Sequence, residues 1–421
     1  LNTTSVSLGD LCEIGLDKER RRAHGVFLHR ELRIRFAQRV LELQTLPAGL
    51  ADREGIQNVV RWYTDFVCDL EDAQVPQTPE QDDDFTNLLT RIFEEHNEVI
   101  QELAFGVQDL MSELGEGYAE VQPQVDAILR RFFMARIGLR FLLQHHIESR
   151  SNREGHSGIL MLSCDVATLA RKAAKDSSAL CRAHLGQSPQ IIVEEVKLRP
   201  DQPTTLTYLP MHLNYMFNEV FKNACRATVE THADGFDDAL PVVRCRIVHG
   251  EEDVCIKVAD EGGGISRRRM QDVWKFMYST YRATPWAALR HKSKPRPAGD
   301  GEGSGPRPRQ GSGAPGVLAG YGVGLTLSRL YAQYFGGDMK IRSMDGYGTD
   351  VYMHISRLGV NCENLPEVVL TSPSMSDSSP LDDSADQERL LVSAEEEAFL
   401  RQELLAFRKS NRSTSESTQG V

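Results

Sequence analysis

The residues from Leu213 to Thr228 constrain this chain most, because they describe a helix with two faces of opposite character. Apolar residues recur at the helical spacing i, i+3, i+4, i+7, i+8, i+11 and form one stripe: Leu213, Met216, Phe217, Val220, Phe221 and Ala224. Four polar residues at i, i+3, i+4, i+7 share the opposite side: Glu219, Lys222, Asn223 and Arg226. An ordinary amphipathic helix with a solvated polar face fits this pattern. The alternative is a helix, anchored from behind, that presents its polar side chains to a ligand.

Composition limits the classes of protein that this chain can represent. Its 421 residues are enough for two or three domains, and 40% hydrophobic and 26% charged residues are typical of a globular protein. A net charge of -12 argues against general nucleic-acid binding, which needs an excess of Lys and Arg. No apolar run is long enough to span a bilayer, so we expect no membrane-embedded part. Eight scattered cysteines without a CxxC pair predict buried reduced thiols.

The first part of the chain, residues 1–150, is dominated by helical periodicity. Helices are expected at about 18–44, 52–71, 83–114 and 123–150, with short polar breaks between them. Four long helices with short connections predict an up-and-down four-helix bundle. Bundles of this kind mostly serve as regulatory or docking domains.

The pair His145-His146 lies near the end of the last of these helices. One interpretation is a phosphate-accepting histidine on a dimerisation helix, as in two-component kinases. The residues that follow, Ile147-Glu148-Ser149, lack the acidic residue and the proline that normally accompany such a site. Polar or core histidines are the simpler interpretation.

Residues 151–358 mix helices and strands, and the polar stretch 149–158 is the expected boundary. A helix is expected at about 165–185 and another at 326–335. The expected strands are at 191–196, 205–208, 242–248, 254–258 and 349–355.

Three glycine clusters interrupt this part. Asp260 is followed by Gly262, Gly263 and Gly264, so a carboxylate at a strand end could accept a hydrogen bond from an exocyclic amine beside a flat ring. Residues 320–325, Gly-Tyr-Gly-Val-Gly-Leu, precede a helix, where free backbone N–H groups can hold phosphate oxygens. No Lys-Ser/Thr follows them, so they are not a P-loop. Residues 346–350 form a third glycine turn that enters the last strand.

The order Glu-x-x-x-Asn, Asp-x-Gly-x-Gly, Gly-x-Gly-x-Gly-Leu, Gly-x-Gly-Thr resembles the GHKL superfamily of gyrase, the Hsp90 chaperones, MutL and the histidine kinases. The runs 218–232, 277–280, 327–338 and 343–350 look like the mitochondrial pyruvate dehydrogenase kinases, with the branched-chain ketoacid dehydrogenase kinases as close relatives. The resemblance covers residues 8 to 358 and implies an α + α/β fold: a helical bundle followed by a GHKL (Bergerat) α/β sandwich.

The resemblance also implies roles for individual residues. Glu219 would be the general base on the substrate serine, Asn223 would bind Mg²⁺, and His146 would adjoin Glu219 and tune its basicity. The residues implied to contact ATP are Glu219, Lys222, Asn223, Arg226, Asp260, Gly262, Gly264, Ser279, Thr280, Gly320, Tyr321, Gly322, Val323, Gly324, Leu325 and Thr349.

The same resemblance implies the partners and the location. The cofactors would be ATP and Mg²⁺, with K⁺ as a further cation, and the chain would be a homodimer in the mitochondrial matrix. It would phosphorylate the α subunit of pyruvate dehydrogenase and use a lipoyl domain as its docking site. A branched-chain ketoacid dehydrogenase is the alternative target. A two-component histidine kinase and a non-catalytic ATP-binding scaffold are the other hypotheses.

Two segments depart from the family pattern. Residues 282–319 are rich in Gly, Pro, Arg and Lys, and we expect a disordered ATP lid there. Residues 359–421 read as a low-complexity tail with a short helix at about 394–409. No Trp follows Trp286, so the Asp-Trp pair that supports the dimer and lipoyl-domain binding in the family is missing from this sequence.

Overall fold

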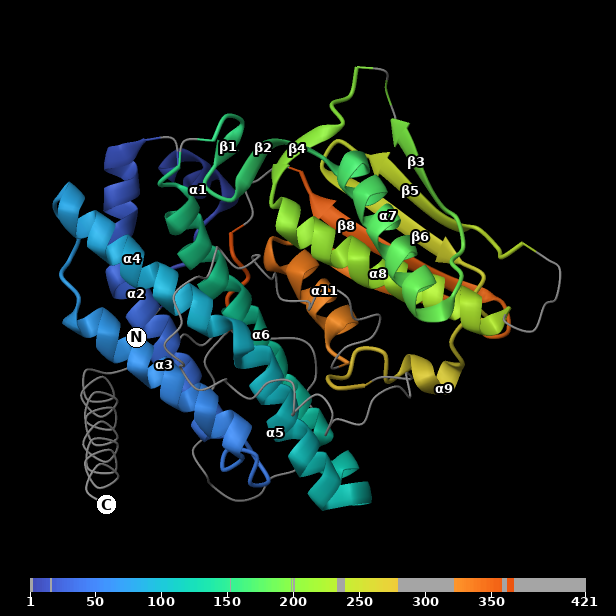
Figure 1. The fold of residues 1–421 in the computed structure, drawn as a ribbon, viewed down its shortest axis with the longest axis horizontal. Helices are drawn as coiled ribbons and strands as arrows, with labels where there is room; N and C mark the ends of the chain where they lie inside the picture. The colour runs from blue at the N-terminus through green and yellow to red at the C-terminus, as the bar shows by residue number, and fades with distance from the viewer. Residues whose placement is uncertain are drawn as a thin grey trace, which may run out of the picture.

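The structure, a computed structural model, describes residues 3–15, 17–151, 153–197, 199, 201–232, 239–278, 322–357 and 362–366. Figure 1 shows a helical part on one side and, on the other, a part in which helices cover a sheet. The expected lid at 282–319, the expected helix at 394–409 and most of the expected tail lie outside the described residues.

The helical part contains six α-helices within the described residues, and its core is built from their apolar stripes. They are α1 (Leu8–Ile14), α2 (Lys18–Gln44), α3 (Glu54–Asp72), α4 (Pro79–Glu95), α5 (Val99–Leu114) and α6 (Tyr118–Glu148), with short 3-10 turns at His96–Glu98 and Gly115–Gly117. The expected helices at 18–44, 52–71 and 123–150 are confirmed within a few residues. Within the described residues, no helix is both long enough and apolar enough to cross a bilayer.

The single helix expected at 83–114 is wrong, because the chain breaks into α4 and α5 at His96. The imidazole of His96 is fully buried, and its Nε2 lies 2.5 Å from the Tyr63 hydroxyl on α3. A tighter turn at this point places the ring inside the bundle, where burial lowers its pKa well below the ordinary value.

The mixed part is built around a five-stranded sheet in the order β3-β5-β6-β8-β7. The strands are β3 (Ile191–Lys197), β5 (Val243–His249), β6 (Asp253–Asp260), β7 (Asp338–Met344) and β8 (Gly348–Ser356). β3 pairs with β5 in parallel, and the other neighbours are antiparallel. The strands β1 (His156–Ser157), β2 (Leu160–Asp165) and β4 (Thr205–Tyr208) form a second, smaller sheet.

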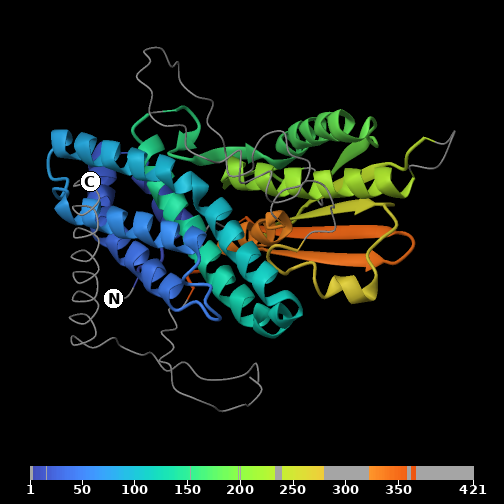
Figure 2. The ribbon, with the colours of Figure 1, turned by 60° about the horizontal axis from the view of Figure 1, so that its bottom comes forward.

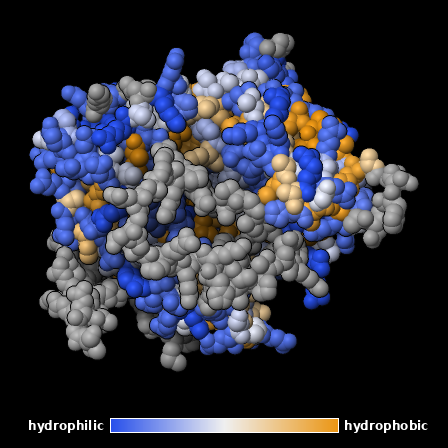
Figure 3. Space-filling model, viewed as in Figure 1, coloured by the Kyte–Doolittle hydropathy of each residue, from blue (hydrophilic) through white to orange (hydrophobic). Residues whose placement is uncertain are grey.

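Helices α7 (Val166–Leu185), α8 (Pro210–Thr231) and α11 (Gly324–Tyr334) cover one face of the five-stranded sheet, and the short α9 (Arg267–Met270) lies at its end. Figure 2 shows this arrangement from the side. α11 packs against both α6 of the bundle and α8, so it lies where the two parts of the molecule meet. On the face drawn in Figure 3 the helical part is mainly hydrophilic, and hydrophobic side chains gather over the mixed part.

Candidate active site

Helix α8 provides the floor of the candidate site. Leu213, Phe217 and Phe221 are at most 1% exposed, which confirms that the predicted apolar stripe anchors the helix. On the other face the Glu219 carboxylate and the Lys222 ammonium form an ion pair, with side chains 16% and 15% exposed. Because both side chains are partly exposed to solvent, this side of α8 is a polar surface and not part of the core.

The glycine turn before α11 lies directly against Glu219. A Cβ atom on Gly324 would lie 2.1 Å from Glu219 Oε2, so only glycine lets the backbone approach the carboxylate this closely. Gly322 has a φ of 74°, and a Cβ there would lie 2.7 Å from the backbone carbon of Met277. The structure therefore brings the predicted phosphate turn and the predicted base together.

The neighbours of these glycines fasten the turn to the core. Val323 is buried at 6% exposure, and Leu325 packs against the main hydrophobic cluster. The predicted residues Ser279, Thr280, Gly320 and Tyr321 lie outside the described residues.

Asp260 is the last residue of strand β6, and only one of its two carboxylate oxygens accepts hydrogen bonds from the described residues. Its Oδ1 accepts hydrogen bonds from the Gly262 amide at 2.9 Å and from the Thr349 amide at 3.3 Å. No hydrogen bond to Oδ2 occurs among the described residues. Burial raises the pKa of Asp260 to about 6, although the two amide donors favour the charged form. A partly dehydrated acceptor of this kind suits an exocyclic amine.

The glycines after Asp260 allow three chain segments to touch. A Cβ on Gly262 would lie 2.5 Å from the Ala227 Cβ on α8, and one on Gly264 would lie 2.0 Å from the Met344 carbonyl oxygen. Sequence reasoning missed Ser343, whose Oγ accepts the Ile265 N–H at 2.7 Å and lies 2.9 Å from Thr349 Oγ1. Ser343 ties the Asp260 loop to the last glycine turn, and its only sequence signal is its place within run 343–350.

The contacts of glycines with α8 put the Gly322–Gly324 turn and the loop after Asp260 at opposite ends of the polar face of this helix. Gly324 meets Glu219 and Gly262 meets Ala227, eight residues further along, which corresponds to about 12 Å along the helix axis. Asn223 lies halfway between them, and its carboxamide makes no hydrogen bond among the described residues. Arg226 follows on the same face, with its Nε 3.9 Å from Glu230 Oε1.

The residues present fit a nucleotide held along α8 with a hard cation. The unused Asp260 oxygen can accept an amine at one end, and the Gly322–Gly324 turn leads into a helix N-terminus at the other. Among the described residues no group of three or more His, Cys, Asp or Glu side chains could hold a metal. A Mg²⁺ ion at α8 would therefore be held by the Asn223 amide oxygen, by phosphates and by water, which is a usual set for this ion.

ATP affinity is expected to weaken as the pH falls below about 6, because protonated Asp260 loses the charge that accepts the amine. Well below that pH, the affinity should fall about tenfold per pH unit. Titrations of the parent between pH 5 and 8 test this. Asp260→Asn is the control and should bind weakly at every pH. A flat profile for the parent would contradict the role of Asp260.

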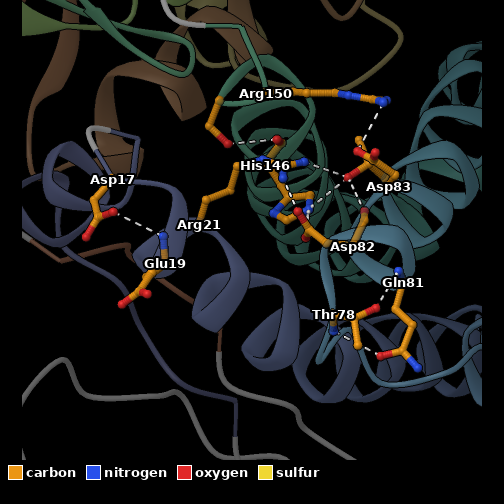
Figure 4. A network of polar contacts seen from close by, with 11 residues as sticks. Asp17, Glu19, Arg21, Thr78, Gln81, Asp82, Asp83, His146 and Arg150 are labelled. Atoms are coloured by element: carbon orange, nitrogen blue, oxygen red, sulfur yellow. Dashed lines mark hydrogen bonds and ion pairs between the residues drawn. The ribbon is translucent and has the colours of Figure 1, made fainter.

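His146 is the predicted site residue whose expected position needs correction. Figure 4 shows it inside the bundle, where its Nε2 lies 3.6 Å from Asp82 Oδ1 and 3.3 Å from Thr86 Oγ1, both on α4. Its side chain is fully buried, and burial lowers its pKa to about 3. None of its described contacts involves Glu219, so the structure favours the interpretation of His145 and His146 as core histidines.

Besides Lys222, Tyr215 also interacts electrostatically with Glu219, from one helical turn earlier on α8. Burial and the charge of Glu219 raise the pKa of Tyr215 well above its ordinary value. Its ring packs on Tyr331 of α11 with the centroids 5.0 Å apart. The i, i+4 spacing from Glu219 was a signal in the sequence that could have identified it.

Comparisons with known proteins agree with this geometry. The family model described as mitochondrial branched-chain alpha-ketoacid dehydrogenase kinase matches residues 5–162, and that of the histidine kinase-, DNA gyrase B-, and HSP90-like ATPases matches residues 209–358. A mitochondrial pyruvate dehydrogenase (acetyl-transferring) kinase of Arabidopsis thaliana is 36% identical over 370 residues, covering 87% of this chain and 94% of the relative. The isozyme 1 kinase of Rattus norvegicus is 34% identical over 351 residues, covering 81% of this chain and 74% of the relative.

The isozyme 3 kinase of Homo sapiens is 31% identical over 370 residues, covering 86% of this chain and 85% of the relative. These similarities extend across the bundle as well as the sheet, and they confirm the resemblance read from the glycine clusters. The chain therefore belongs to the GHKL family of mitochondrial pyruvate dehydrogenase and branched-chain ketoacid dehydrogenase kinases.

Proposed function

We propose that this chain is an ATP-dependent protein serine kinase of the mitochondrial matrix that phosphorylates the α subunit of pyruvate dehydrogenase and so inactivates the complex. The observation that carries the proposal is the contact between the Glu219 carboxylate and the Gly322–Gly324 turn. It puts a proton acceptor beside the place where backbone N–H groups can hold phosphates. The names of the relatives, all mitochondrial pyruvate dehydrogenase kinases, support the choice of target.

In this proposal each of the four polar residues on the exposed side of α8 has a separate role. Glu219 takes the proton from the serine hydroxyl. At the same time the serine oxygen bonds to the terminal phosphorus of ATP, and ADP leaves. The ion pair with Lys222 orients the carboxylate, and Arg226 adds positive charge along the same face. Bound Mg²⁺ would neutralise phosphate charge, with Asn223 as its protein ligand.

The proposal includes the partners expected from the sequence: a homodimer, and a lipoyl domain of the dehydrogenase complex as the docking site. The long helices among the described residues cover one face of the five-stranded sheet (Figure 2). On the opposite side of the sheet Figure 2 shows the short α9 and no long helix among the described residues, and we propose this side as the surface for a second copy. K⁺ is proposed as a further cation of the nucleotide site.

The test is incubation of the full chain with labelled ATP, Mg²⁺ and each purified ketoacid dehydrogenase complex. Acid-stable label on serine of the pyruvate dehydrogenase α subunit is the expected result. Label on the branched-chain enzyme alone would support the alternative target, a branched-chain ketoacid dehydrogenase. The family model that matches residues 5–162 is described as a kinase of that enzyme. Acid-labile label on the chain itself would contradict both and support a histidine kinase.

A further inference from the structure

Three distant parts of the chain meet at the side chain of Glu363, which is fully buried. Its Oε2 accepts the Val6 N–H of the N-terminal segment at 3.0 Å. Its two oxygens also accept hydrogen bonds from Arg35 on α2: Nη1 donates to Oε1 at 3.1 Å, and Nη2 donates to Oε2 at 2.9 Å. The hydroxyl of Tyr334, the last residue of α11, donates to Oε1. We call Arg35, Tyr334 and Glu363 the Glu363 clasp.

The clasp is charged, buried and fully bonded. Arg35 Nε donates to Glu31 Oε1 at 2.9 Å, and its Nη2 also donates to the Thr4 carbonyl at 2.7 Å. The Arg35 and Tyr334 side chains are at most 4% exposed, and burial raises the pKa of Tyr334 well above its ordinary value, so its hydroxyl remains a donor. Removing one partner from such a cluster leaves a buried charge without compensation, which makes the cluster a strong fixed point.

Backbone contacts hold the same segment in place. The backbones of Cys362 and Ser7 form an isolated antiparallel β-bridge, and the Glu363 N–H donates to the Val6 carbonyl at 3.0 Å. The Asn364 N–H donates to the Tyr334 carbonyl at 2.9 Å, at the end of α11. Residues 362–366 therefore join the N-terminal segment to α11 through their main chain as well as through Glu363.

Helix α11 connects the clasp with the candidate site. It has 11 residues and is about 16 Å long. It begins at Gly324, against Glu219, and ends at Tyr334 in the clasp. Gly138 on α6 makes room for this end, because a Cβ there would lie 2.5 Å from the Tyr334 hydroxyl. A short helix fixed at one end transmits a shift of that end to the other, because packed elements move as units.

We propose that Glu363 is a positioning residue for the kinase reaction: through Tyr334 it fixes the far end of α11 to the bundle and so sets the position of the Gly322–Gly324 turn against Glu219. This rests on the proposed function of the same site. It assigns the segment at 362–366 a task in catalysis, although it lies at the opposite end of α11 from the nucleotide turn.

The sharpest variant is Tyr334→Phe, which removes the hydroxyl that joins α11 to Glu363 and keeps the ring packing. The full-length variant should bind ATP about tenfold more weakly, with a raised KM for ATP and a smaller fall in kcat. Hydrogen exchange of the α11 amides, measured without nucleotide, should accelerate. Glu363→Gln keeps the shape, removes the charge and should produce the same pattern.

Glu31→Gln is the matched control, because Glu31 contacts the same Arg35 at 3% exposure and none of its described contacts is with α11. It should lower the melting temperature without changing ATP affinity or α11 exchange. Unchanged affinity and exchange in Tyr334→Phe and Glu363→Gln, or equal changes in Glu31→Gln, would overturn the positioning role. Because the exchange measurement needs no nucleotide, a parent that failed to bind ATP would refute the proposed function separately.

Discussion

Replacing Glu219 with glutamine is expected to leave ATP binding nearly normal and to lower phosphotransfer to the dehydrogenase by roughly 10²- to 10⁴-fold. Glutamine has the shape of glutamate and still fits against Gly324, but its amide cannot take the serine proton. The ion pair with Lys222 is lost as well, so a small change in ATP affinity is expected. Calorimetric titration with ATP and the initial rate of phosphate incorporation separate the two effects.

The matched control for this variant is Glu194→Gln on the edge strand β3. Glu194 pairs with Arg246 at 2.9 Å on the surface, at side-chain exposures of 36% and 56%, away from α8. It should bind ATP and phosphorylate the target like the parent. A Glu219→Gln protein that transfers phosphate at the parent rate would show that another group accepts the proton.

Replacing Asn223 with alanine is expected to remove the Mg²⁺-dependent part of ATP binding, a loss of roughly 100-fold in affinity. The reason is the position of the carboxamide, halfway between the two loops and unused by the described residues. ATP titrations with Mg²⁺ and with a chelator measure this difference directly. In the variant the two titrations should coincide.

Asn218→Ala on the same helix is the control. Its Nδ2 donates to the Asn214 carbonyl at 2.8 Å, and its Oδ1 accepts from Ser177 Oγ on α7, so it serves packing. This variant should melt earlier and keep its response to Mg²⁺. An Asn223→Ala protein with unchanged Mg²⁺-dependent affinity would refute the ligand role.

The features that could be predicted from the sequence are those encoded over short stretches. The two faces of α8 follow from helical spacing, and β4, β5 and β6 follow from alternating apolar residues between turns. The glycine loops could be recognised in order along the chain, and several of their described glycines are required by a close approach, such as that of Gly324 to Glu219. Local patterns therefore predicted a helical first part and a mixed second part, and the family resemblance that these patterns carry implied the GHKL fold and the residues that the structure groups along α8.

The remaining features depend on contacts between residues far apart in the chain. β7 was missed although its burial alternates along the strand, because only Met339 and Ile341 are apolar among its inward-facing residues, which is too short a pattern to predict a strand. The break at His96 depends on a hydroxyl on α3 that periodicity cannot reveal. The Glu363 clasp joins Arg35 to a residue 328 positions away, and nothing near either residue indicates the pairing. His146 was assigned by resemblance, and its contacts with α4 correct that assignment.

A crystal structure of the full chain with Mg²⁺ and a non-hydrolysable ATP analogue would show whether the polar face of α8 is the floor of the nucleotide site. We expect the adenine amine on Asp260 Oδ2, the metal on the Asn223 oxygen and the terminal phosphate between Glu219 and the Gly322–Gly324 turn. A nucleotide bound elsewhere, or a terminal phosphate beyond the reach of Glu219, would contradict this expectation.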